Sequence, residues 1–189
     1  MNFLKKLFTI SSKKKLYSYY MDELSAHFKS VTIKGPIAPS YFASIMAVIV
    51  VTGESYKKWN LVIEADAAEQ RSICELKNRT VTLCYNITQY SEKDVKFILL
   101  HELRHVQQFD LDMFGTSIYS TEYMQRVDVF KGVPMLPWVH YTNHSEKPTE
   151  IDANEYAIAY LGTSGYSNYI VKQIIEETLA ISSTSTMAA

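Results

Sequence analysis

This sequence has few cysteines, almost no net charge and no long apolar run. The 189-residue chain has two cysteines, Cys74 and Cys84, which are too few for a disulfide scaffold, and we expect both thiols to be reduced. Its 19 lysines and arginines nearly balance its 20 aspartates and glutamates, so there is no general reason to expect binding to nucleic acid.

The sequence also lacks the marks of a transmembrane segment and of a secretory signal. Its longest apolar run, residues 37–51, contains Pro39 and is too short to span a bilayer. Near the N-terminus the lysines lie within and after the apolar residues, whereas a secretory signal places them before a continuous apolar stretch. We therefore expect a soluble, cytoplasmic protein whose basic N-terminal segment is a frayed or docked helix rather than a membrane anchor.

The length and the apolar content together predict one domain with a substantial core. Apolar residues make up 47% of the chain, and no internal repeat divides it. We expect a single domain over residues 1–189, with residues 1–12 as an N-terminal extension and residues 182–189 as a disordered tail.

Local patterns predict a mixture of helices and strands. Helical spacing or helix boundary signals predict helices over 13–28, from Pro39 to about Gly53, and over 91–109, 148–161 and 166–181. Short apolar runs predict strands at 60–65, 72–77 and 80–86, the last two forming a hairpin. We expect an α+β fold in which a small sheet of three to four strands packs on a central helix.

The helix at 91–109 is the best candidate for that central position. Ser91 followed by Asp94 resembles a capping box, with Asp in the place of the usual Glu. Apolar residues form two stripes along this helix, and a helix that is apolar on two sides is buried on two sides. Its sequence therefore places the polar motif HELRH, residues 101–105, in the interior.

HELRH has the composition and the spacing of a metal site. His101 and His105 are four residues apart, so their rings lie on one face of the helix and can point at one metal ion. Zinc accepts imidazole ligands, and a catalytic zinc site adds one more protein ligand and a water molecule. Glu102 is placed to take a proton from that water as a general base. The competing interpretation, two core histidines held by hydrogen bonds, leaves a costly buried glutamate between them.

A third ligand is expected from the helix at 148–161. Glu150 shares one face of that helix with Ala153, Asn154 and Ala157, and the two alanines allow close packing on the motif helix. Asn154 is expected to hydrogen-bond a ligand from outside the metal's own shell. The other downstream acids and histidines considered are Glu122, His140, His144, Glu146, Asp152 and Glu155. Asp152 and Glu155 are expected to be solvated helix charges, with Asp152 away from the metal, either at the surface or just outside the ring of ligands.

The two motifs together resemble a known family. HELRH followed by EIDANEYA (150–157) is similar to the HExxH…ExEANxFA pattern of the ImmA/IrrE-type metallopeptidases, a branch of the gluzincins. The resemblance implies a compact zincin-like domain with three zinc ligands: His101, His105 and Glu150. It also implies that Glu102 is the general base.

The resemblance covers residues 91–161 and has departures. Asp152 stands where the family has a second Glu, Tyr156 stands where it has Phe, and no helix-turn-helix segment is present. The strand at 80–86 would be the edge along which such enzymes lay an extended substrate.

We therefore expect a zinc-dependent metallopeptidase acting on a peptide or protein, with an intracellular regulatory protein as one candidate substrate. The candidate donors for stabilising the transition state are His140, Tyr141 and His144, because their segment leads into the helix that carries Glu150. Two alternatives stay open: a catalytically silent zinc-binding module, and a small-molecule metallohydrolase with a closed pocket. The oligomeric state does not follow from the sequence.

Overall fold

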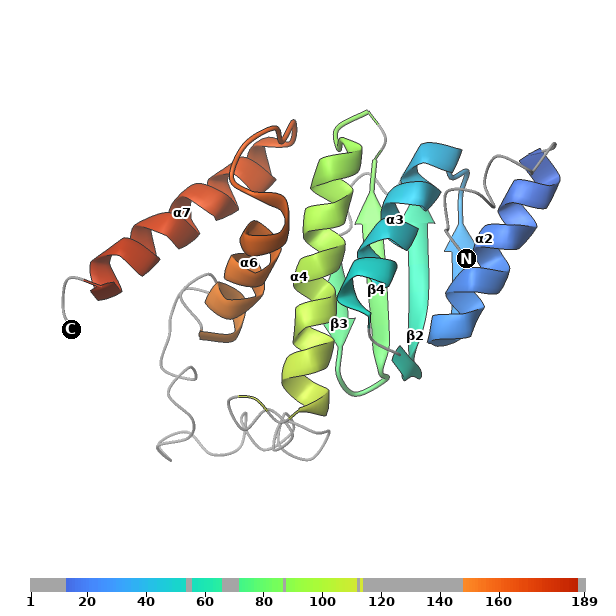
Figure 1. Cartoon of the computed structure of the whole chain (residues 1–189), viewed down its shortest axis with the longest axis horizontal. Coiled ribbons are helices and arrows are strands. Elements are labelled where there is room, and N and C mark those ends of the chain that lie inside the picture. Colours follow the sequence, from blue (N-terminus) through green and yellow to red (C-terminus); the bar gives the residue numbers. More distant parts are fainter. Residues whose placement is uncertain are drawn as a thin grey trace.

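The computed structural model describes residues 13–53, 56–65, 72–86, 88–111, 113 and 148–186 (Figure 1). The described elements, in chain order, are α2 (Lys13–His27), β1 (Phe28–Lys34), α3 (Pro39–Thr52), β2 (Tyr56–Ala65), β3 (Ile73–Glu75), β4 (Thr80–Tyr85), α4 (Glu92–Asp110), α6 (Pro148–Leu161) and α7 (Tyr169–Thr186). The fold is α+β, as the sequence predicts.

The four described strands form one mixed sheet in the order β1-β2-β4-β3. β1 pairs with β2 and β2 pairs with β4 in parallel, while β3 runs antiparallel to β4. The predicted hairpin between β3 and β4 is confirmed. The prediction that residues 80–86 form an edge is wrong, because β4 pairs on both sides and β3 lies at the edge instead.

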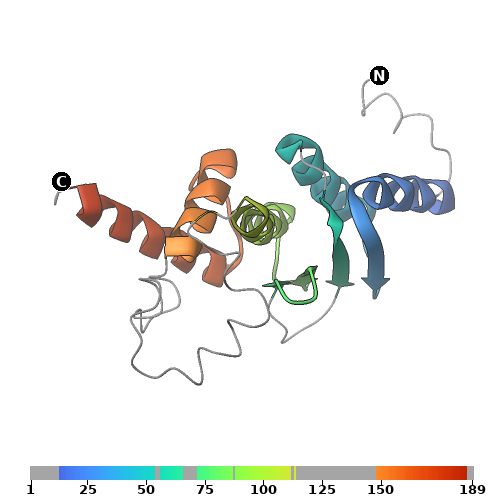
Figure 2. The same ribbon diagram turned by 90° about the horizontal axis from the view of Figure 1, so that it is seen from below.

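Helices pack on one face of this sheet, and α4 lies at the centre of the molecule. Figure 2 shows α2 and α3 on the same side of the strands, with α4 beside them and α6 and α7 beyond α4. The apolar side chains of the sheet point to the helices: Leu61, Ile63, Val81 and Leu83 are fully buried. Along α4, the stripe Val95, Leu99, Leu103 and Val106 is buried as predicted.

One strand, β1, is absent from the sequence-based prediction. The apolar series that defines α2 ends on Phe28, which belongs to the strand: the helix passes into β1 with no intervening loop. Phe28 is buried, as the helical spacing of the apolar residues also predicts, so that spacing could not distinguish the end of the helix from the start of the strand. β2 also begins at Tyr56, earlier than the predicted residue 60. The sequence did not predict its first residues, because an irregularity in the pairing with β1 interrupts the alternation of buried and exposed side chains between Tyr56 and Trp59.

The α7 helix differs from its prediction at both ends. It begins at Tyr169, where Asn168 accepts hydrogen bonds from the backbone N–H groups of Ile170 and Val171. It continues to Thr186, so residues 182–186 are helical and are not part of a disordered tail. Serine and threonine hydroxyls bond to helix carbonyls along this stretch, for example Ser182 to Thr178, which is compatible with a helix despite their low propensity.

The N-terminus of α4 is anchored by a buried carboxylate. The predicted capping box is confirmed, since Ser91 accepts from the Asp94 backbone N–H and Asp94 accepts from that of Ser91. Asp94, which is fully buried, also accepts from the hydroxyl and backbone of Ser167 and from the backbone of Asn168. One side chain therefore joins the start of α4 to the start of α7.

Replacing Asp94 tests this anchor. Burial alone would raise the pKa of Asp94, but hydrogen bonds from Ser167, Ser91 and Asn168 outweigh burial and lower it. A carboxyl whose pKa is lowered by folding stabilises the fold above its unfolded pKa of about 3.9 and stops doing so as pH falls through the folded value. Asp94→Asn should lower the free energy of unfolding by about 1–3 kcal/mol at pH 7, and by less at pH 3.

Urea denaturation at the two pH values measures the difference. Asp22→Asn, at an exposed position on α2, is the matched control and should change the unfolding free energy little. An equal loss for Asp94→Asn at both pH values would contradict an ionised anchor.

Candidate metal centre

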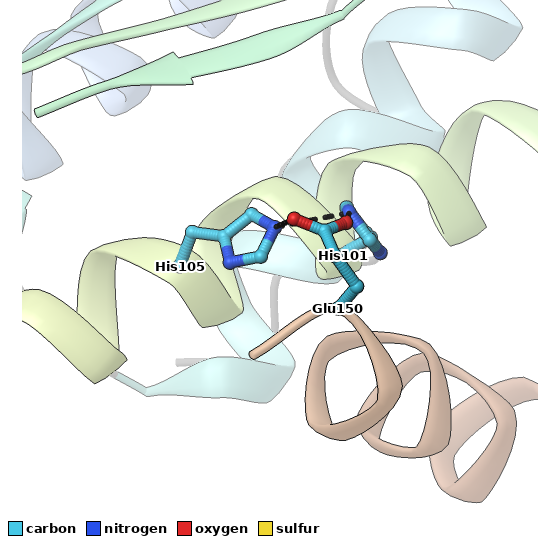
Figure 3. Close-up of side chains that lie close together, drawn as sticks. All are labelled: His101, His105 and Glu150. Carbon is cyan, nitrogen blue, oxygen red and sulfur yellow. Dashed lines mark hydrogen bonds and ion pairs between the residues drawn. The ribbon is translucent and has the colours of Figure 1, made fainter. Parts of the chain in front are cut away.

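Three side chains from two helices converge beside the middle of α4. Figure 3 shows His101 and His105, one turn apart on α4, with Glu150 reaching them from the first turn of α6. The three residues form a group that could hold a metal ion. The sequence predicted this juxtaposition, and the ligand role of each residue stays a prediction.

The donor atoms of these three side chains lie close to one another. The Nε2 atoms of His101 and His105 are 3.1 Å apart, and they lie 3.3 Å and 3.4 Å from the two carboxylate oxygens of Glu150. Each Nε2 atom thus faces a different oxygen of the same carboxylate, and one ligand atom from each of the three residues lies within 4.8 Å of the others. These separations allow the three side chains to reach one metal ion.

The centre is partly open. The side chains of His101 and His105 are each 16% exposed to solvent, and that of Glu150 is 13% exposed. Structural zinc sites are closed by four protein ligands, whereas catalytic sites leave one position for water or substrate. Among the residues that the structure describes, three donors with residual exposure match the second arrangement.

Both histidines are oriented by an amide oxygen. The Nδ1 atom of His101 lies 2.7 Å from Oδ1 of Asn154, which is buried on α6, as predicted for that residue. The Nδ1 atom of His105 lies 2.8 Å from Oε1 of Gln108. An amide oxygen only accepts, so each Nδ1 carries the proton and each Nε2 is directed to the shared point.

Positive charge is favoured at that point. Burial lowers the pKa of His105, but the hydrogen bond and charge of Glu150, together with Glu102 and Gln108, outweigh burial and raise the pKa to about 9. A proton on Nε2 therefore satisfies the carboxylates in the absence of a metal, and a metal cation at the same point would replace that proton.

Glu102 is buried next to these groups. Burial raises the pKa of its carboxyl above the ordinary value, and Glu150 adds to the rise, while His101 and His105 oppose it. The backbone N–H of Cys74, on the edge strand β3, is near enough to this carboxyl to oppose the rise in its pKa. A carboxyl with a raised pKa beside a metal position is suited to accepting and returning a proton.

Cys74 lies close to the centre without being a candidate nucleophile. Burial raises the pKa of its thiol well above the ordinary value, and the charges of Glu102, Asp110 and Glu150 add to that rise. The thiol therefore stays protonated, and the reactive form of cysteine is the thiolate. Both cysteines are free thiols, as predicted.

Of the two positions predicted for Asp152, at the surface or outside the ring of metal ligands, the structure shows the second. Its carboxylate accepts two hydrogen bonds from Arg104, at 2.7 and 3.0 Å, across the α4–α6 contact, and one from Gln108 at 2.8 Å. Burial would raise the pKa of Asp152, but Arg104 and Gln108 outweigh it and lower the pKa. This ion pair joins α4 to α6 beside the two histidines.

Sequence reasoning missed Gln108 altogether. Its position three residues after His105 puts it on the same side of α4, which is the one signal that would have drawn attention to it. The candidate donors His140, Tyr141 and His144 lie outside the described residues, as do Glu122 and Glu146.

No protein-family model, curated protein or solved structure matches this chain. The resemblance to the ImmA/IrrE-type metallopeptidases therefore rests on the quoted motifs and stays a prediction. Among the helices of the described ranges, we find none with the length and apolar character needed to cross a membrane.

Metal binding by the purified chain is the first test of this centre. We expect about one zinc ion per chain, because three donors converge on one point. Native mass spectrometry measures the stoichiometry, with His101→Ala plus His105→Ala as the variant that should lose the ion. Retention of the ion by that double variant would show that it binds elsewhere.

The affinity for zinc should also depend on pH. Because zinc must displace the proton of His105, whose pKa is about 9, affinity should rise about tenfold for each pH unit between 7 and 8.5. Competition with a chromogenic chelator at several pH values measures this slope, after correction for the chelator's own protonation. A flat profile would contradict proton displacement at the site.

Proposed function

We propose that this chain is a zinc-dependent metallopeptidase of the zincin type. The observation that supports it most strongly is the convergence of His101, His105 and Glu150 from two helices on one point. When bound there, zinc supplies a Lewis acid that polarises a carbonyl oxygen and lowers the pKa of a water molecule.

The residues of the chain have separate tasks in this reaction. The two histidines and Glu150 hold the cation and are themselves oriented from outside. Glu102 takes the proton of the attacking water and returns it to the leaving amine, so that a peptide bond and a water molecule become a carboxylate and an amine. Its buried position and raised pKa support this role.

The edge strand β3 supports a peptide as the substrate. Cys74 lies on β3, and its backbone N–H is close enough to the carboxyl of Glu102 to affect the pKa of that group, so this strand lies near Glu102. An extended peptide can add to a sheet edge through main-chain hydrogen bonds. The proposed substrate edge is therefore β3, in place of the 80–86 strand expected from the sequence.

A silent zinc-binding module is the main competing function. Burying an ionisable carboxyl such as Glu102 beside a metal position costs free energy, and a purely structural site has no use for it. Incubating the zinc-loaded chain with a mixed peptide library in H₂¹⁸O distinguishes the two functions. Hydrolysis would place ¹⁸O in new C-terminal carboxylates, whereas a zinc-loaded chain that yields none would support the silent module.

Glu102→Gln tests the assigned base. The variant should keep its zinc, because Glu102 is not among the three converging donors, while hydrolysis should slow by about two to four orders of magnitude. Peptide turnover and zinc content are measured on the same samples. Glu92→Gln, in the first turn of α4, is the control and should keep both. Loss of zinc from Glu102→Gln would make Glu102 a ligand or a structural support.

A further inference from the structure

We propose that Gln108 is a positioning residue that fixes both the ring of His105 and the place of Glu150, and that Arg104 and Asp152 hold Gln108 in its working orientation. The inference rests on the metal centre proposed above, and it adds three residues that act through the ligands.

The contacts of Gln108 determine which way its amide group faces. Its Nε2 atom donates to the backbone carbonyl of Thr149 and to the carboxylate of Asp152, each at 2.8 Å. Both partners accept only, so this end of the amide must be the NH₂ group. The oxygen is then directed at Nδ1 of His105, which must donate, and Nε2 of the ring is left to face the metal position.

The same amide connects ligands on different helices. Thr149 immediately precedes Glu150, so the bond from Gln108 to the Thr149 carbonyl ties α4 to the backbone beside the third ligand. Gln108 is 2% exposed, which shields these bonds from competing water. One side chain thus fixes a ligand of α4 and locates the ligand of α6.

Arg104 makes this arrangement resistant to rotation of the amide. Its two hydrogen bonds fix the plane of the Asp152 carboxylate, which then presents an oxygen to Gln108. A flipped amide would place its oxygen against that carboxylate and its NH₂ group against the protonated Nδ1 of His105. Both contacts would be repulsive, so the ion pair selects a single orientation.

Zinc affinity of the full-length chain tests the proposal. Gln108→Leu should weaken zinc binding by about 10- to 100-fold, the usual effect of losing an outer partner of a histidine ligand. Gln107→Leu is the matched control: it removes a buried amide from the next position of α4, which contacts Arg104 and Tyr156 and no ligand. Its zinc affinity should stay within about threefold of wild type, even where its stability falls.

A polarity exchange separates positioning from general packing. Gln108→Glu alone should weaken zinc binding at least as much as Gln108→Leu, because two carboxylates would then meet across the helix contact. Adding Asp152→Asn supplies an amide donor to that carboxylate and should recover about tenfold in affinity, since residues in contact couple by such amounts. Absorption of the cobalt-loaded proteins should show tetrahedral bands in the wild type and in the double variant.

The outcomes distinguish the inference from the metal centre itself. A wild-type chain that binds no zinc would overturn the centre and the inference together. Wild-type binding with unchanged affinity in Gln108→Leu, or equal losses in Gln107→Leu, would overturn the inference alone. A zinc-binding chain without peptidase activity would leave the inference standing, because its readout is affinity.

Discussion

The close packing of α6 against α4 is the constraint on which the candidate site depends. Ala153 and Ala157 are fully buried on the face of α6 that meets α4, and their small side chains let the two helices approach closely. Only at such an approach does a carboxylate in the first turn of α6 reach two rings on α4. The ligand atoms therefore come from regular helices, and their relative positions are fixed by helix packing and not by loop conformation.

That packing also determines which parts could be predicted from the sequence. The capping box, the buried stripe Val95, Leu99, Leu103 and Val106, and the shared face of Glu150 and Asn154 follow from local helix signals, and the structure has all of them. The second stripe of α4, which carries the two histidines, is only partly buried. β1 could not be separated from α2, because Phe28 continues the helical spacing. The order of the strands could not be predicted either, since pairing joins segments far apart in the chain.

The sequence also did not predict the contacts of Gln108 and Asp152, because these contacts likewise join segments that are far apart in the chain. Each residue looks ordinary on its own helix, where a polar side chain at the margin of an apolar stripe is expected to meet solvent. Their partners lie across the interface, at 2.7–3.0 Å, and are visible only once the register of α6 on α4 is known. Sequence periodicity identifies a shared face, but it does not identify which polar groups meet across it.

The choice of amides as histidine partners follows from the charge of the site. A dication held by neutral histidines at this site would be balanced by two nearby carboxylates, those of Glu150 and Glu102. Carboxylate partners for the rings would add buried negative charge beyond that balance, whereas Asn154 and Gln108 fix the rings without any. The remaining acid, Asp152, contacts Gln108, and its charge is neutralised by its ion pair with Arg104. Orientation is thus supplied by neutral groups, and in the proposed reaction this leaves Glu102 as the carboxyl that would move a proton.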